Sequence, residues 1–240
     1  MAVKFCVSTH YGIRAQTVTA LGVLQRKDVK FGLQIARGRD MASCKNMLIS
    51  TDSESRHAVP DSEYTHFFFL DQDAIPDASV MEALIDSDKD IAVAAHKGIS
   101  GEEMACGKWG VRAGEMGETL PLDAVGWHKV DWAMLSCMCV KREVLSTMER
   151  PWFHPHCMLR IDSSVTPPRE IILEMTPDIG FCWAAQEQGY SIDAYLAPGI
   201  TMKYMWGEYG LSEIAHKVHL SYISEGPTHL GGESGSNDPR

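Results

Sequence analysis

Several common features are missing from this 240-residue sequence, and each absence narrows what the protein can be. No apolar run approaches the roughly 20 residues that a transmembrane helix needs. The first residues, Met1 to Phe5, lack the long apolar core of a signal peptide. We therefore expect a soluble, cytoplasmic protein. No internal repeat is found either.

Cysteines give no framework for disulfides or zinc. There are seven, an odd number, and they are scattered along the chain without the spacing of a zinc site. We expect reduced thiols, as in a reducing compartment. Cys137 and Cys139 lie two apart in an apolar run, and as strand residues they would face one side and be buried in the core.

Positive charge is scarce overall but concentrated near the start. The net charge is −10, yet residues 1–50 hold eight Lys and Arg against two acids, so that this part carries +6 and the remainder −16. The acidic remainder argues against broad non-specific binding to nucleic acid, which depends on a basic face. A basic first part beside an acidic motif suits a phosphate-bearing ligand.

That acidic motif follows the most distinctive stretch, residues 65–76. Its apolar and aromatic residues are unbroken, which predicts a buried central strand. Asp71 and Asp73 end the run, and side chains two apart in an extended chain point the same way. Two like charges placed together favour a shared cation, and carboxylate oxygens suit Mg²⁺ or Mn²⁺. The alternative is an Asp-rich turn before a helix that begins near Asp77.

The first fifty residues predict a strand–helix–strand unit. Residues 3–8 and 30–35 are strand-like, and apolar residues recur at helical spacing across 14–26. Open α/β sheets bind ligands at the carboxyl ends of their strands. Tyr11 could therefore stack on a base and Thr9 could bind a ribose or base edge, although both could equally be ordinary loop residues.

Basic residues that could reach a phosphate follow. Asp40 is a candidate N-cap for a helix over 41–49. Arg39 before it and Lys45 on it could both reach a diphosphate, or could be solvated surface charges. Lys97 follows the strand after the aspartate motif, and it is a candidate contact to the phosphate-bearing ligand.

The second half is less regular. We predict one strand over 130–140, a helix over 141–148, a helix over 179–188 and a strand over 190–196. Residues 159–171 and 198–206 are predicted to be irregular, and residues 100–126 to form an irregular excursion or a small hairpin. Pro177 and Asp178 stand at the start of the predicted helix over 179–188. The helix dipole favours an acid such as Asp178 at that end.

Seven short features in this order resemble one family. They are Thr9-His10-Tyr11, Ala15-Gln16, Lys45-Asn46, Thr65-His66 with Asp71-Gln72-Asp73, Lys141-Arg142-Glu143-Val144, Pro151-Trp152-Phe153, and Asp178-Ile179-Gly180-Phe181 through Gly189-Tyr190. Together they make the sequence similar to the GT-A glycosyltransferases, in particular small family-two-like members of phages and large viruses, over roughly residues 3–206.

The resemblance implies an α/β fold of GT-A (Rossmann-like) type, with a mixed, mostly parallel sheet flanked by helices. It implies a single catalytic domain over 1–224, with a nucleotide-binding half over 1–98 and an acceptor-side half over 99–224. Residues 225–240 carry no apolar anchors, and we expect a disordered tail there.

The resemblance also assigns roles. Asp73 would be the firmest ligand of Mn²⁺ or Mg²⁺ on the diphosphate of a UDP- or GDP-linked sugar, and Asp71 would lie near both the ion and the ribose. The ion would stabilise the leaving group. Thr9 and Tyr11 would hold the nucleoside. Asp178 would orient or deprotonate the acceptor hydroxyl.

Three departures from the family pattern stand out. Lys45 replaces an Arg, so that bidentate phosphate binding is lost there, and Pro177 stands where a second acid is usual. The family's third metal ligand, a His, is also missing from its place. His216 or His219 could supply it, Lys203 could serve instead as a cation on the diphosphate, or the metal could be weakly held.

Two other functions stay open. A nucleotidyltransferase shares a related sheet and metal, but residues 9–12 do not form its usual Gly-rich loop. A non-catalytic module that binds nucleotide sugars is the other alternative. The acceptor is equally undetermined: protein, glycan, lipid-linked glycan or, for a viral protein, a modified DNA base.

Overall fold

The computed structural model describes residues 1–9, 21, 28–38, 40–50, 58–72, 74–98, 103–110, 116–162, 166–197 and 202–204. All of them belong to one compact unit, Met1–Met205. A second unit, Trp206–Arg240, lies outside the described residues, as does the predicted tail. Among the residues described, no helix is long and apolar enough to cross a membrane.

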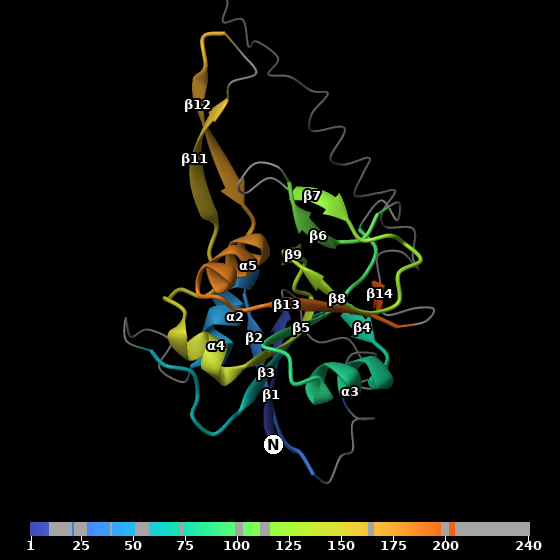
Figure 1. Ribbon diagram of the computed structural model, residues 1–240. Coiled ribbons are helices and arrows are strands. Elements are labelled where there is room, and N and C mark those ends of the chain that lie inside the picture. Colours follow the sequence, from blue (N-terminus) through green and yellow to red (C-terminus); the bar gives the residue numbers. More distant parts are fainter. Residues whose placement is uncertain are drawn as a thin grey trace, which may run out of the picture. The chain divides into compact units, whose positions relative to one another are not determined.

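A seven-stranded sheet in the order β2-β1-β3-β10-β5-β13-β8 forms the centre of this unit (Figure 1). Its strands are β1 (Ala2–Thr9), β2 (Lys30–Arg37), β3 (His66–Asp71), β5 (Ile91–Ala94), β8 (Gly126–Val130), β10 (Cys137–Lys141) and β13 (Ile192–Leu196). Only β10 and β8 run against the other five strands. The predicted α/β class and mixed, mostly parallel sheet are confirmed, and the arrangement is compatible with a Rossmann-like fold.

Helices cover both faces of the sheet (Figure 1). They are α2 (Met41–Ile49), α3 (Ala78–Asp86), α4 (Arg142–Thr147) and α5 (Pro177–Glu187). One core cluster joins the sheet to α2, α4 and α5, and a second joins the opposite face to α3.

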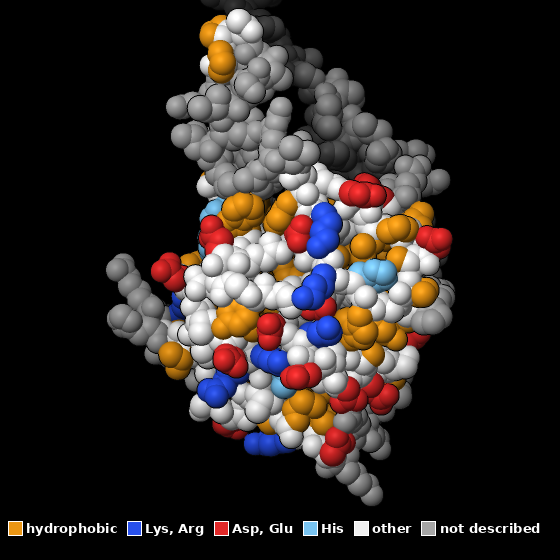
Figure 2. All heavy atoms as spheres, in the orientation of Figure 1, with side chains coloured by type: hydrophobic (Ala, Val, Ile, Leu, Met, Phe, Trp, Pro, Cys, Tyr) orange, Lys and Arg blue, Asp and Glu red, His pale blue; other side chains and the backbone are white. Residues whose placement is uncertain are grey.

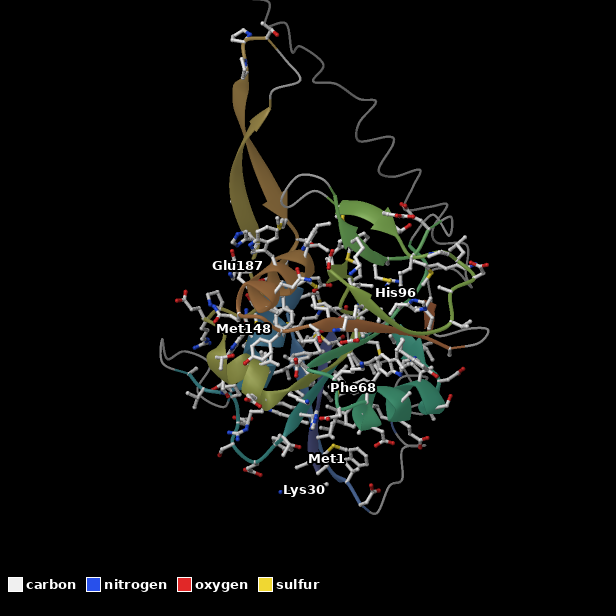
Figure 3. All side chains as sticks on the ribbon, viewed as in Figure 1. Met1, Lys30, Phe68, His96, Met148 and Glu187 are labelled. Carbon is white, nitrogen blue, oxygen red and sulfur yellow. The ribbon has the colours of Figure 1, made fainter. Side chains whose placement is uncertain are left out.

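Strand β3 contributes side chains to both clusters, because successive side chains of a strand point to opposite faces. Phe67 and Phe69 belong to the first cluster, and Phe68 and Leu70 belong to the second. All four are fully buried. Phe68, labelled in Figure 3, packs on the α3 side of the sheet. The predicted buried central strand is therefore confirmed, and it ends at Asp71.

The predictions for the start of α2, the start of α5 and the cysteine pair are also confirmed. Asp40 caps α2 by accepting hydrogen bonds from the backbone N–H groups of Ala42 and Ser43, each at 3.1 Å. Helix α5 begins with Pro177, and Asp178 lies in its first turn. Cys137 and Cys139 are both buried, in the same core cluster.

Three predictions for the second half were wrong. The run over 130–140 is not one strand: β8 ends at Val130, β9 (Trp132–Ala133) follows, and β10 begins at Cys137. Residues 159–171, predicted as an irregular stretch, belong mostly to β11 (His156–Asp162) and β12 (Arg169–Met175), which pair along their full length. Residues 198–206, also predicted as irregular, contain β14 (Met202–Tyr204), which pairs with β4 (Ala74–Pro76).

The stretch over 100–126 contains the predicted small hairpin. Strands β6 (Cys106–Trp109) and β7 (Met116–Thr119) pair antiparallel, and β9 joins them on the other edge of β6. This small sheet packs near α5, which contacts β9.

Candidate functional site

Polar residues gather at the carboxyl edge of the main sheet. Strands β1 and β3 run in parallel, and their register places Ser8 beside Asp71. Strand β10 runs the other way, so the chain enters it at this same edge, through Leu135 and Ser136. A strand end, a strand start and two helices thus meet where ligands bind in open α/β sheets.

Asp71 is held firmly but is partly open to solvent. Ser8 Oγ donates a hydrogen bond of 2.8 Å to Asp71 Oδ1. The Asp71 backbone N–H donates to the carbonyl of Ser136 at 2.8 Å. The Asp71 side chain is 17% exposed, so a ligand can reach it.

Lys45 projects from α2 into the same place and is almost completely buried, with 3% of its side chain exposed. Its Nζ lies 3.0 Å from Asp178 Oδ1 and 3.6 Å from Asp71 Oδ1. It also donates to the backbone carbonyl of Leu135 at 3.2 Å. The three N–H donors of this ammonium therefore face three oxygens.

Burial by itself would lower the pKa of Lys45, since it disfavours the charged form. The attraction of Asp178, and then of Asp71, outweighs that cost and raises the pKa of Lys45 above its ordinary value. The ammonium is therefore charged at neutral pH, and it balances one of the two negative charges beside it.

Asp178 completes the arrangement from the first turn of α5. Its Oδ1 faces Lys45, and its Oδ2 accepts a hydrogen bond of 3.0 Å from the backbone N–H of Leu135. Its side chain is 19% exposed. We call Lys45, Asp71, Asp178 and the backbone of Leu135 the Lys45 cluster.

The next residue on α2 fixes the helix in place. Asn46 Nδ2 donates to the carbonyl of Phe153 at 2.7 Å, and the Phe153 N–H donates back to Asn46 Oδ1 at 3.0 Å. The Phe153 ring stacks on Phe181 of α5, with centroids 4.6 Å apart, and meets Phe69 edge-on at 5.3 Å. Lys45 Nζ lies 5.4 Å from the centroid of the Phe153 ring, which places the ammonium over an aromatic face.

The structure favours roles for Lys45 and Thr9 that differ from those the sequence suggested. Lys45 was considered as a diphosphate ligand or a surface charge, but it is buried against two carboxylates. Thr9, considered as a nucleoside contact, is 1% exposed, and its hydroxyl donates to Gln72 Oε1 at 2.8 Å. Both residues are therefore buried beneath the site, where they contact the polar side chains that line it.

The other candidates are more widely placed. Lys97 is exposed and forms an isolated bridge with Met104 just after β5. Lys203 lies in β14 opposite Ile75, so its strand runs beside the segment that follows the aspartate motif. The remaining candidates, namely Tyr11, Arg39, Asp73, His216 and His219, lie outside the described residues.

Sequence reasoning missed Ser8, Gln72 and the backbone of Leu135. Ser8 had one available signal: it is a hydroxyl residue at the end of an otherwise apolar strand. Leu135 had none, because its contribution comes from its N–H and carbonyl and not from its side chain.

One carboxylate at this edge, that of Asp71, is of the type that binds a hard divalent cation. Within the part of the chain that the structure describes, no three His, Cys, Asp or Glu side chains form a metal-binding group. Asp71 is the only predicted metal ligand that falls in this part, and it presents a carboxylate at the site. Such oxygens suit Mg²⁺ or Mn²⁺, which often take one or two carboxylates together with substrate phosphates.

Charged side chains of both signs are interspersed on the face shown in Figure 2. On this face the mixture differs from the continuous basic surface that non-specific nucleic-acid binding requires.

Comparisons with known proteins define the fold and no more. No family model matches the chain, and no curated protein matches it. Among solved structures, A197 from STIV superposes with a TM-score of 0.52 at 16% sequence identity, covering 85% of this chain and 84% of that one. A likeness at this identity establishes a shared α/β fold over most of both chains.

Proposed function

We propose that this protein is a metal-dependent glycosyltransferase of GT-A type, which moves a sugar from a UDP- or GDP-linked donor to a hydroxyl acceptor. One observation carries the proposal. Asp71 and Asp178, which the sequence resemblance assigns to the donor and the acceptor, lie on either side of one buried ammonium at the carboxyl edge of the sheet.

Asp71 acts on the donor side, together with Asp73 two residues later. Asp71 presents its carboxylate at the end of β3, oriented by the Ser8 hydroxyl. A divalent ion bound there supplies Lewis-acid stabilisation of the charge that develops on the leaving diphosphate. Arg39 and Lys203 are the cations that we assign to the diphosphate itself, and Tyr11 is assigned to the nucleoside.

Asp178 acts on the acceptor side. Both of its oxygens already accept a hydrogen bond, but a carboxylate oxygen has two lone pairs and can accept another. An acceptor hydroxyl at the exposed side of Asp178 is thus oriented by it and can transfer its proton to it as the new glycosidic bond forms.

Hydrolysis of nucleotide sugars tests this function, because water replaces the unidentified acceptor. The wild type is incubated with Mn²⁺ and a panel of UDP- and GDP-sugars, beside Asp73→Ala and Asp178→Asn. We expect both variants to be at least about a hundredfold slower, in the range that general-base and metal contributions span.

Asp88→Asn is the matched control. Asp88 has 95% of its side chain exposed and has a φ of 49°, a conformation that Asn tolerates as well as Asp does. We expect it to hydrolyse the donor at the wild-type rate. If wild type and Asp73→Ala share a background rate while calorimetry detects bound UDP or GDP, the protein is a non-catalytic binding module. If neither turnover nor nucleotide binding is found, the proposal is wrong.

A further inference from the structure

The Lys45 cluster joins parts of the chain that are far apart in sequence. Lys45 comes from α2, Asp71 from β3 and Asp178 from α5, while the Leu135 backbone comes from the loop before β10. Each of these elements contributes one charged or polar group to a point where almost no water enters, since only 3% of the Lys45 side chain is exposed.

We propose that Lys45 is a positioning residue that holds the donor-side and acceptor-side carboxylates in one charge-balanced cluster and thereby sets how tightly Asp71 binds a divalent cation. The naming of the two sides and the presence of a divalent cation at Asp71 rest on the proposed function, whereas the charge-balanced cluster is seen in the structure.

The effect on a cation follows from the atoms involved. Lys45 Nζ and the Ser8 hydroxyl both face Asp71 Oδ1, at 3.6 Å and 2.8 Å. A metal ion at this carboxylate therefore has to bind beside a fixed positive charge. Because the ammonium is buried, water screens this repulsion poorly.

Asp178 moderates that repulsion. Its Oδ1 is closer to Lys45 than Asp71 Oδ1 is, at 3.0 Å against 3.6 Å, so more of the positive charge is offset there. Without the negative charge of Asp178, the ammonium would act on Asp71 alone. Substituting Lys45 and substituting Asp178 should therefore change cation affinity in opposite directions.

The binding of Mn²⁺ alone provides the test, with free Mn²⁺ measured by electron paramagnetic resonance. We expect Lys45→Met to bind Mn²⁺ about tenfold more tightly than the wild type, and Asp178→Asn about tenfold more weakly, as charges a few ångströms away at partial screening imply. Lys45→Arg keeps the charge and should stay within about threefold of the wild type. Circular dichroism confirms that each variant is folded.

Lys30→Met is the matched control for the loss of a lysine. Lys30 forms an exposed ion pair with Glu63, with 68% of its side chain exposed, at the first residue of β2 and so at the opposite edge of the sheet. It should leave Mn²⁺ affinity unchanged.

A purely structural role for Lys45 makes a different prediction, because a loosened site binds the cation more weakly in both variants. Weaker binding by folded Lys45→Met, unchanged binding by Asp178→Asn, or no binding by the wild type each overturns the proposal. Should Lys45→Met not fold, Asp178→Asn and Lys45→Arg decide the matter. If the opposite shifts are found but no nucleotide sugar is hydrolysed, this inference stands and the proposed function fails.

Discussion

Replacing Asn46 by leucine removes the link between α2 and the segment that carries Phe153, while keeping the number and branching of the side-chain heavy atoms. The amide of Asn46 makes two buried hydrogen bonds to the Phe153 backbone, one as donor at 2.7 Å and one as acceptor at 3.0 Å. Leucine can make neither. The Phe153 N–H and carbonyl then stay buried without those partners.

The magnitude follows from these two groups. Each buried polar group left without a partner costs about 1–3 kcal/mol, so the two together cost about 2–6 kcal/mol, and leucine recovers about 0.5 kcal/mol through its better helix propensity. The expected loss in the free energy of unfolding is therefore about 1.5–5.5 kcal/mol. For a domain of this size it corresponds to a decrease in Tm of roughly 3–22 °C.

Urea unfolding followed by tryptophan fluorescence measures this loss, since Trp152 is buried beside the altered segment. Met47→Ala, at the next position of α2, is the control: Met47 is 50% exposed, and its replacement should change stability by less than about 0.5 kcal/mol. Asn46→Asp keeps the acceptor but sets a buried carboxylate oxygen against the Phe153 carbonyl, so it should lose at least as much stability as Asn46→Leu at neutral pH. A loss below about 1 kcal/mol for Asn46→Leu would show that the Asn46 clamp does not hold α2.

Two further predictions concern α5 and the thiols. Gly180→Ala should lower Tm despite the better helix propensity of alanine, because the added Cβ would lie 2.7 Å from the carbonyl oxygen of His154; a rise in Tm would show that the neighbouring segment yields easily. In native protein at pH 8, a thiol reagent should modify Cys157 quickly and the other six cysteines slowly, because those six are buried; burial raises the pKa of Cys106 and of Cys139 to about 12, so little reactive thiolate forms. Rapid reaction of several thiols before unfolding would contradict the buried placement.

The main sheet was predictable where hydrophobicity alone decides the structure. The unbroken apolar run of β3 had to be buried on both faces, and this placed Asp71 at the carboxyl edge. The helix start at Asp40 and the proline-led start of α5 were predictable because capping depends on local residues.

The interior of the site was not predictable in the same way. Lys45 and Asn46 are polar residues within a short helix, and their burial depends on Asp178 and Phe153, more than a hundred positions later. No local pattern encodes such pairing. The hairpin of β11 and β12 was missed for a related reason, since its strands satisfy each other's backbone hydrogen bonds and need no apolar alternation against the main core.

The distance along the chain between Lys45 and Asp178 has a consequence for synthesis of the protein. These residues are 133 positions apart. At about 5–20 residues per second, the ribosome needs roughly 7–27 s to produce Asp178 after Lys45. During that interval the first strands and α2 must remain soluble with the lysine still hydrated. Asp71 and the Leu135 carbonyl are made earlier, but the closest carboxylate to the ammonium comes only with α5, so a nascent chain stopped before Asp178 lacks the group that completes its charge balance.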